Sequence, residues 1–284
     1  MRKLKWHYNR IKSYIGRPRL IVQEKPIVLD DTNRCENPIF IIGVHRSGTS
    51  LVRRMFNSHP DIACPPETFF MQGYVDLFND HLSEVGYQAF GYDKDAMRQD
   101  LARKASSLHE AFRISQGKSL WADKTPQYTA IIDDLDRLFG RKARFFLVMR
   151  HPCDVVYSNF KRGWSFNDIE DPFESTIKHV RDGIDNILAF EQAQPDRCAR
   201  IDYRELCIDP AATLETAMSK LGLSYHPEML EFASKSHNYG LEDPVVRGKK
   251  TVEASAGAWQ SLTSGQRDQL AQAFGQKVKE DAYW

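Results

Sequence analysis

The sequence predicts an α/β fold in which a central parallel β-sheet is flanked by helices. Two stretches carry this prediction, because each has the pattern of a buried strand, a tight turn and a helix. The first runs from Pro38 to Phe56 and the second from Arg144 to Phe160. Strand-like and helical segments alternate along the rest of the chain, as they do in βαβ units.

The first stretch is typical of a loop that binds an anion. Residues 39–42 are branched or aromatic, and Gly43 and Gly48 then enclose four residues, the glycine spacing of a P-loop. In such a turn, backbone N–H groups converge on an anion at the N-terminus of the next helix. Thr49 stands where an ATP-hydrolysing P-loop has lysine, so Arg46 supplies the positive charge. An ordinary turn with a solvated arginine remains the alternative.

The second stretch places another cation at the end of a strand. Arg150 closes the apolar strand 144–149, and Ser158 lies two turns into the following helix. Ligands of open α/β sheets bind at the carboxyl ends of the strands. Arg46 and Arg150 therefore suit a ligand with two separate anionic groups.

The remaining elements complete the α/β pattern. We expect the polar stretch 71–118 to cover the site and shape the substrate pocket, with a helix near 95–112. Residues 238–258 form a basic loop that contains Lys249 and Lys250. The other expected elements are strands at 62–64, 119–123 and 199–203, and helices at 128–139, 174–193, 210–221, 227–236 and 264–279.

Composition limits the classes of partner. The chain has 39 basic and 38 acidic residues and a net charge of +1, so no overall field favours nucleic acid. Its five cysteines are odd in number and lack metal-ligand spacing, which favours free thiols in a reducing compartment, the cytoplasm. No apolar run has the length of a membrane span, and no signal-peptide pattern occurs.

The N-terminal segment differs from the rest in charge. Residues 1–20 contain seven Lys or Arg and no acid. A basic amphipathic helix is therefore expected, which suits peripheral contact with an anionic membrane surface, docking on a partner, or ordinary packing. We divide the chain into this helix and lead-in, residues 1–37, and a single domain, residues 38–284. Its apolar residues at helical spacing are Leu4, Tyr8, Ile11 and Ile15.

A magnesium-dependent mechanism is not expected. The P-loop nucleotide kinases and NTPases need a loop lysine and an acid that holds Mg²⁺. The nearest acids at strand ends are Asp123 and Asp202, and neither follows a typical apolar run. We therefore predict no metal, with a kinase or NTPase as the alternative function.

Three motifs in order resemble the sulfotransferases that use 3′-phosphoadenosine 5′-phosphosulfate (PAPS). Residues 43–50 resemble the family's 5′-phosphosulfate loop, residues 146–158 its 3′-phosphate motif, and residues 123–126 a third signature. The resemblance covers roughly residues 38–260. It implies the P-loop-like sulfotransferase fold, PAPS as donor, and transfer of a sulfuryl group to an acceptor hydroxyl of a carbohydrate, lipid, phenol or peptide tyrosine. A non-catalytic nucleotide-binding protein and a homodimer also stay open.

The resemblance also implies roles for individual residues. Asn57 to Thr68 is similar to the tyrosylprotein sulfotransferase branch, in which Glu67 would be the general base and Lys124 the catalytic lysine. Arg46 would be the third catalytic residue. Donor binding would fall to Arg46, Ser47, Gly48, Thr49, Ser50, Arg150, Ser158, Tyr203, Lys249 and Lys250.

Alternatives remain for these roles. His45 and His59 are rival bases, and Glu67 and Lys124 also suit purely structural positions at a helix start and a strand end. The peptide-modifying branch has an arginine where this chain has Phe69, which weakens the prediction of an acidic peptide acceptor.

Overall fold

The computed structural model describes residues 33–237, 252 and 256–275. The expected N-terminal basic helix, the loop residues Lys249 and Lys250, and the end of the last expected helix lie outside these residues.

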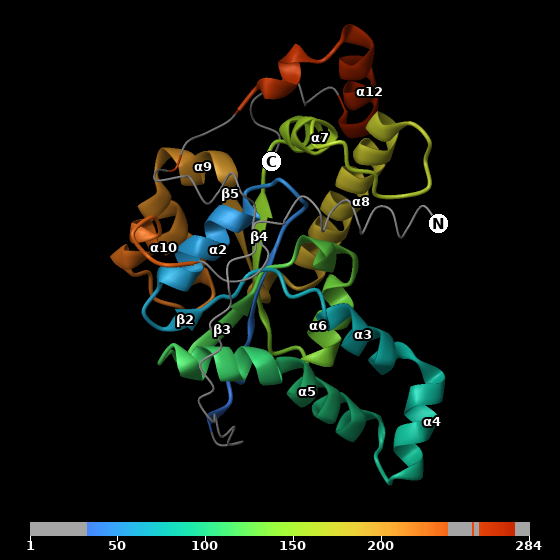
Figure 1. Ribbon diagram of the computed structural model, residues 1–284, viewed down its shortest axis with the longest axis vertical. Helices are drawn as coiled ribbons and strands as arrows, with labels where there is room; N and C mark the ends of the chain where they lie inside the picture. The colour runs from blue at the N-terminus through green and yellow to red at the C-terminus, as the bar shows by residue number, and fades with distance from the viewer. Residues whose placement is uncertain (1–32, 238–251, 253–255, 276–284) are drawn as a thin grey trace.

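Five parallel strands form one sheet in the order β2-β3-β1-β4-β5 (Figure 1). In the centre, Ile39 of β1 pairs with Ala122 of β3 on one side and Arg144 of β4 on the other. The turn after β1 therefore lies between the carboxyl ends of β3 and β4, where both other motifs begin. The strands are β1 (Ile39–Ile42), β2 (Ile62–Ala63), β3 (Leu120–Asp123), β4 (Arg144–Met149) and β5 (Cys198–Asp202).

The two faces of the sheet bury separate apolar cores, because side chains alternate along each strand. Ile39 and Ile41 pack with α2, α9, α10 and η4, whereas Phe40 and Ile42 pack with α6, α7 and α8. The helices on the first face are α2 (Thr49–Ser58), α9 (Tyr203–Ile208), α10 (Pro210–Lys220) and the short 3₁₀ helix η4 (Pro227–Glu231). Those on the second face are α6 (Ile132–Leu138), α7 (Pro152–Phe160) and α8 (Pro172–Ala193).

The polar stretch 71–118 is more regular than the sequence suggests. It forms α3 (Met71–Asn79), α4 (His81–Ala89) and α5 (Lys94–Ser115). Asp80 and Asp93 cap the N-termini of α4 and α5 with their side chains, which explains two helix starts that apolar periodicity does not reveal. In Figure 1 α5 passes below β3, α3 and α4 extend to the lower right, and α4 is the outermost of the three.

Three other boundaries differ from expectation. The helix expected at 128–139 is divided into the 3₁₀ helix η2 (Pro126–Ala130) and α6, with Ile131 in a non-helical conformation between them. The unexpected α9 begins where the Asp202 carboxylate accepts hydrogen bonds from two backbone N–H groups. Of the helix expected after Pro227, only η4 forms. The last described elements are η5 (Ala258–Ser261) and α12 (Ser264–Phe274).

All five cysteines are free thiols, as expected, and Cys64, Cys153 and Cys198 are buried. Among the residues described, no helix is both long and apolar enough to cross a membrane.

Candidate active site

The turn between β1 and α2 is shaped by its two glycines. A Cβ at Gly43 would lie 2.6 Å from the Thr49 methyl carbon and 2.9 Å from the Val148 carbonyl oxygen. Gly48 has φ 104°, and a Cβ there would lie 2.3 Å from the Tyr203 ring. Both positions therefore require glycine. Arg46 also has a positive φ, 73°, a conformation that non-glycine residues adopt mainly where surrounding structure enforces it.

The two predicted anion sites adjoin each other. Arg46 donates from Nε to Ser158 Oγ at 3.1 Å, although the sequence assigned these residues to different anionic groups. Arg150 donates from Nη1 to the Arg46 carbonyl oxygen at 3.0 Å, so the second cation supports the strained turn of the first. Arg46 in the turn after β1, Arg150 directly after β4 and Ser158 of α7 thus form one positively charged unit.

Tyr203, the first residue of α9, joins this unit from the end of β5. The Arg150 guanidinium lies over its ring at 5.0 Å from the centroid, within the range of a cation–π contact. Burial raises the pKa of Tyr203 to about 12, so its hydroxyl stays protonated at neutral pH. Contacts with both Gly48 and Arg150 therefore hold Tyr203 beside the 43–50 turn.

The predicted base and catalytic lysine lie together. Lys124 Nζ is 2.7 Å from Glu67 Oε1, and it also donates to Ser50 Oγ at 3.3 Å. The Lys124 side chain is only 2% exposed and that of Glu67 10%. One ammonium group thus links the carboxylate to the first turn of α2, on the rim of the anion-binding loop.

A second layer holds Glu67 in place. Thr68 donates through its hydroxyl to Asp123 Oδ2 at 2.7 Å, and its backbone N–H donates to Thr125 Oγ1 at 3.1 Å. The Tyr128 hydroxyl lies 3.0 Å from Thr68 Oγ1 and accepts from the Met71 backbone N–H. Asp123 and Thr125 flank Lys124, so this network fixes the base and the lysine to one strand end.

This layer was missed by the sequence analysis, although a signal was available. A threonine directly follows both Glu67 and Lys124. A hydroxyl side chain next to a charged residue can form hydrogen bonds that hold the backbone, and so the charged side chain, in position. Phe69, the next residue, has φ 64°, so a second strained position adjoins the site.

The acids considered as metal ligands are engaged elsewhere. Asp123 bonds to Thr68 and Thr125 and lies 3.1 Å from His109 Nε2, whereas Asp202 caps α9. Among the described residues, no group of three or more His, Cys, Asp and Glu side chains is arranged to hold a metal ion.

The rival bases have other contacts. His45 Nδ1 lies 3.1 Å from His179 Nε2, within an aromatic group that includes Trp164 and Phe166. His59 lies in the turn after α2, with Nε2 2.9 Å from the Ser224 carbonyl oxygen and Nδ1 accepting from the Asp61 backbone. Burial lowers the pKa of His59. The contacts of both histidines suit packing and turn formation.

The segment that follows the late basic loop is anchored on α7. The Trp259 ring stacks on His151 at 5.8 Å, and the Gly257 backbone donates to Asp154 Oδ2 at 3.1 Å. Since His151 follows Arg150 directly, the chain returns to the anion site just after residues 238–255. The roles of Lys249 and Lys250 stay predictions.

The residues present fit a ligand with two anionic groups. Ser47 Oγ is buried and has no hydrogen-bond partner among the described residues, which suits a hydroxyl that a ligand would satisfy. It lies in the same turn as Arg46 and Gly48. Helix α2 begins at the next residue, Thr49, so the positive end of the helix dipole points toward this turn.

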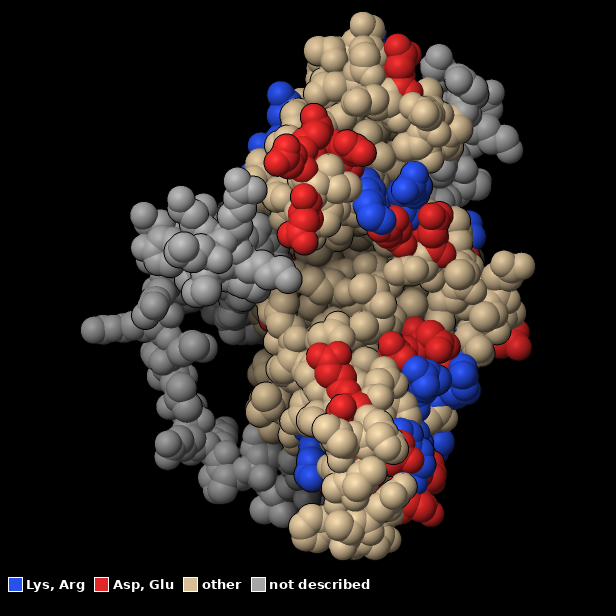
Figure 2. Space-filling model, turned by 90° about the vertical axis from the view of Figure 1, so that its right-hand side faces the viewer, with Lys and Arg blue, Asp and Glu red and all other residues tan. Residues whose placement is uncertain are grey.

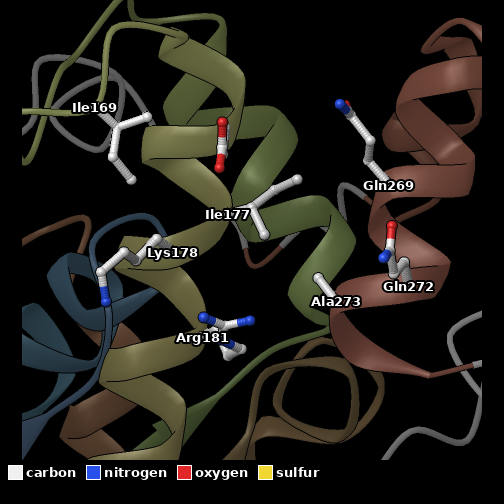
Figure 3. Close-up of a pocket in the computed structure, with 8 residues that line it drawn as sticks. Ile169, Ile177, Lys178, Arg181, Gln269, Gln272 and Ala273 are labelled. Atoms are coloured by element: carbon white, nitrogen blue, oxygen red, sulfur yellow. The ribbon is translucent and has the colours of Figure 1, made fainter.

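A pocket of about 430 Å³ lies apart from these residues, between α8 and α12. Figure 3 shows Ile177 and Arg181 of α8 facing the same space as Gln269 and Gln272 of α12. None of the predicted site residues that the structure describes lines it.

Comparison with known proteins places the chain among the sulfotransferases. A sulfotransferase family model matches residues 38–227. The chain is 25% identical over 204 residues to a putative protein-tyrosine sulfotransferase of Caenorhabditis briggsae, covering 69% of each protein. Four other curated relatives are longer, and the chain covers 31% to 59% of them.

Solved structures show the same fold. The sulfotransferase domain of the Synechococcus PCC 7002 olefin synthase matches with a TM-score of 0.61 and 24% identity, over 84% of this chain and 95% of that one. Mouse sulfotransferase SULT7A1, solved with PAP, matches with a TM-score of 0.51 and 15% identity, over 87% and 86% of the two chains. The predicted family, α/β fold and transferase class are confirmed.

Proposed function

Because this chain belongs to the sulfotransferase family, we propose that it transfers a sulfuryl group from PAPS to an acceptor hydroxyl. The observation that carries the proposal is the contact of Glu67 with Lys124, 2.7 Å, beside Ser50 of the anion-binding turn. The mouse sulfotransferase solved with PAP supports the choice of donor.

Two groups of residues would hold the donor. The N–H groups of the 43–50 turn, with Arg46 and Ser47, suit the 5′-phosphosulfate. Arg150 and Ser158 suit the 3′-phosphate, because guanidinium and hydroxyl donors match phosphate oxygens. Arg46 bonds to Ser158 in the structure, so donor binding exchanges that contact for contacts with the two anionic groups.

The donor supplies a sulfur atom joined through oxygen to a phosphate, which is a good leaving group. Glu67 takes the proton of the acceptor hydroxyl as the acceptor oxygen bonds to sulfur. The bond between sulfur and the bridging oxygen breaks, and its electron pair stays on the phosphate of adenosine 3′,5′-bisphosphate. Lys124 and Arg46 stabilise the charge that develops there. Positioning by the network around Thr68 lowers the entropic cost of bringing base and acceptor together.

The acceptor lies next to Glu67 and therefore next to aromatic side chains. Phe69 and Phe70 follow the base, and Phe70 packs against His109 and Tyr74. These neighbours favour an acceptor that presents an uncharged or apolar surface around its hydroxyl, such as a phenol, lipid or carbohydrate. Similarity to protein-tyrosine sulfotransferases keeps peptide tyrosine in the panel to be tested.

Calorimetry and a transfer assay test the proposal. Adenosine 3′,5′-bisphosphate should bind at least tenfold more tightly than AMP, and ³⁵S from labelled PAPS should reach one class in a panel of phenols, hydroxylated lipids, glycans and tyrosine peptides. Glu67→Gln and Lys124→Met should lower turnover at least 100-fold and leave binding of the bisphosphate within threefold.

Arg181→Ala is the control for Arg150→Ala, because Arg181 lines the pocket between α8 and α12. Only Arg150→Ala should weaken binding of the bisphosphate. Equal binding of AMP and the bisphosphate would refute the donor assignment. Bisphosphate binding without any transfer would favour the non-catalytic alternative, and magnesium-dependent ATP turnover the kinase or NTPase alternative.

A further inference from the structure

Helix α4 exposes the stripe that a helix normally buries. The stripe follows the spacing i, i+3, i+4, i+7, i+8, which marks the core-facing side of an amphipathic helix, and consists of Leu82, Val85, Gly86 and Ala89 of α4 with Phe90 directly after it. Here all five residues are exposed, Leu82 by 76% and Phe90 by 85%, and α4 has no buried residue. In Figure 2 the lower part of the molecule shows a tan area of uncharged residues bordered by acidic and basic side chains.

The polar side of α4 packs against its neighbours instead. Lys94 of α5 pairs with Glu84 at 2.6 Å. The Tyr87 hydroxyl donates to Asp100 Oδ2 at 2.7 Å, and Lys104 bonds the same carboxylate. These contacts hold the polar side of α4 against α5, so the apolar side faces solvent. A stripe of this kind marks a docking surface.

The surroundings of the stripe are acidic. Residues 71–100 contain six Asp or Glu and two Lys or Arg. Within the described chain, no Lys or Arg forms an ion pair with Asp76, Asp80 or Asp93. A partner that fits this surface therefore combines an apolar stripe with a basic rim.

The N-terminal segment has that chemistry and starts from the right place. Residues 1–20 contain seven basic residues, no acid, and apolar residues at helical spacing. The described chain begins on α5, where Arg113 donates to the Asn33 carbonyl, Arg34 to the Arg103 carbonyl, and the Cys35 backbone to Glu110 Oε1. Residues 21–32 can span about 40 Å, whereas the helix rise from Arg103 back to Lys94 is about 14 Å.

We propose that the basic N-terminal segment, residues 1–20, docks on the exposed stripe of α4 in its own chain. The apolar side of the segment covers Leu82, Val85 and Phe90, and its basic residues face Asp76, Asp80 and Asp93. The surface lies at the end of the excursion remote from the sheet, so the contact is independent of the proposed donor site (Figure 1).

Photo-crosslinking in the full-length protein tests the contact. Val85 is replaced by p-benzoylphenylalanine, and equal amounts of ¹⁴N- and ¹⁵N-labelled chains are mixed before irradiation. Mass spectrometry should find crosslinks from position 85 to residues 1–20 within one isotope label. Reversing the charge of Lys5, Arg10 and Lys12 to Glu should lower their yield at least fivefold.

Circular dichroism checks that the reversed variant keeps the fold of the parent protein. The same photoreactive residue at Ile208, an exposed apolar position on α9, is the matched control and should give no crosslink to residues 1–20. Mixed-label crosslinks to α4 or to residues 1–20 of a second copy would overturn the proposal. The proposal would also be overturned if position 85 formed no crosslink to residues 1–20 of its own chain, including the case in which the segment binds anionic vesicles instead.

Discussion

Replacing Thr68 with valine removes the hydroxyl that fixes the loop of the proposed base and keeps the shape of the side chain. Thr68 donates to Asp123 Oδ2 at 2.7 Å and contacts the Tyr128 hydroxyl at 3.0 Å. Asp123 is 1% exposed, so water cannot replace the lost donor, and Oδ2 keeps only the longer contact with His109 Nε2 at 3.1 Å. A hydrogen bond to a charged group contributes about 1.5–3 kcal/mol, and a buried acceptor left unsatisfied loses a comparable amount.

We therefore expect Thr68→Val to lower the free energy of unfolding by about 2 kcal/mol, which corresponds to a fall in melting temperature of about 3 °C for a chain of 284 residues. Turnover should fall roughly 10–100-fold, because Glu67 loses the anchor of the adjacent residue and misplacement by about 1 Å is costly. Bisphosphate affinity should change less than threefold, since the 43–50 turn and Arg150 are untouched.

Denaturant unfolding, the ³⁵S transfer assay and calorimetry measure these three effects. Thr213→Val is the matched control, because the Thr213 hydroxyl bonds to the Asp209 carbonyl in α10 and touches no site residue. The reasoning is refuted if Thr68→Val changes stability no more than the control does. Lost stability with full turnover would show that the network supports the fold alone.

Three other predictions follow from single features. Gly48→Ala forces a Cβ to 2.3 Å from the Tyr203 ring at φ 104°, so calorimetry should show bisphosphate affinity reduced at least tenfold, with Gly73→Ala, which meets no atom within 4 Å, as control. Burial lowers the pKa of His179 to about 4, below its ordinary value near 6.5, so only the unfolded chain binds this proton between those values. The free energy of unfolding should fall as pH drops from 6.5 to 4, by at most about 3 kcal/mol, and His179→Gln should flatten that part of the profile. Transfer activity should survive EDTA within twofold, because Arg46 and Lys124 supply the positive charge; loss of activity that Mg²⁺ restores would contradict this.

The sheet and the motif residues follow from the sequence because their signals are local. The runs 39–42 and 145–149 are apolar throughout, as strands buried on both faces require, and parallel pairing then brings the turn after each to one edge. Arg46, Arg150 and Tyr203 are brought together for this reason, and Glu67 with Lys124 by the pairing of β2 with β3.

What the sequence does not reveal depends on contacts between distant residues. The bond between Arg46 and Ser158 links positions 112 residues apart, and no periodicity encodes it. The orientation of α4 is a similar case. Its stripe predicts a buried side, but Glu84 and Tyr87 bind α5 through the opposite side, and only the packing shows which side faces solvent.

The 43–50 loop has Thr49 where an ATP-hydrolysing P-loop has lysine. The residues at the end of β3 argue against a degraded ATP site. In P-loop NTPases a carboxylate near the phosphates holds Mg²⁺, and the ion neutralises the leaving group. Here the strand-end acid beside β1 is Asp123, and its two oxygens accept from Thr68 and Thr125. The following residue, Lys124, places a positive charge against Ser50 of the loop. In the proposed mechanism, the same strand end thus uses its acid to hold the proposed base in position and its lysine to supply the charge. Replacing Asp123 with asparagine should accordingly impair turnover through the position of Glu67, and added Mg²⁺ should not change the size of the loss.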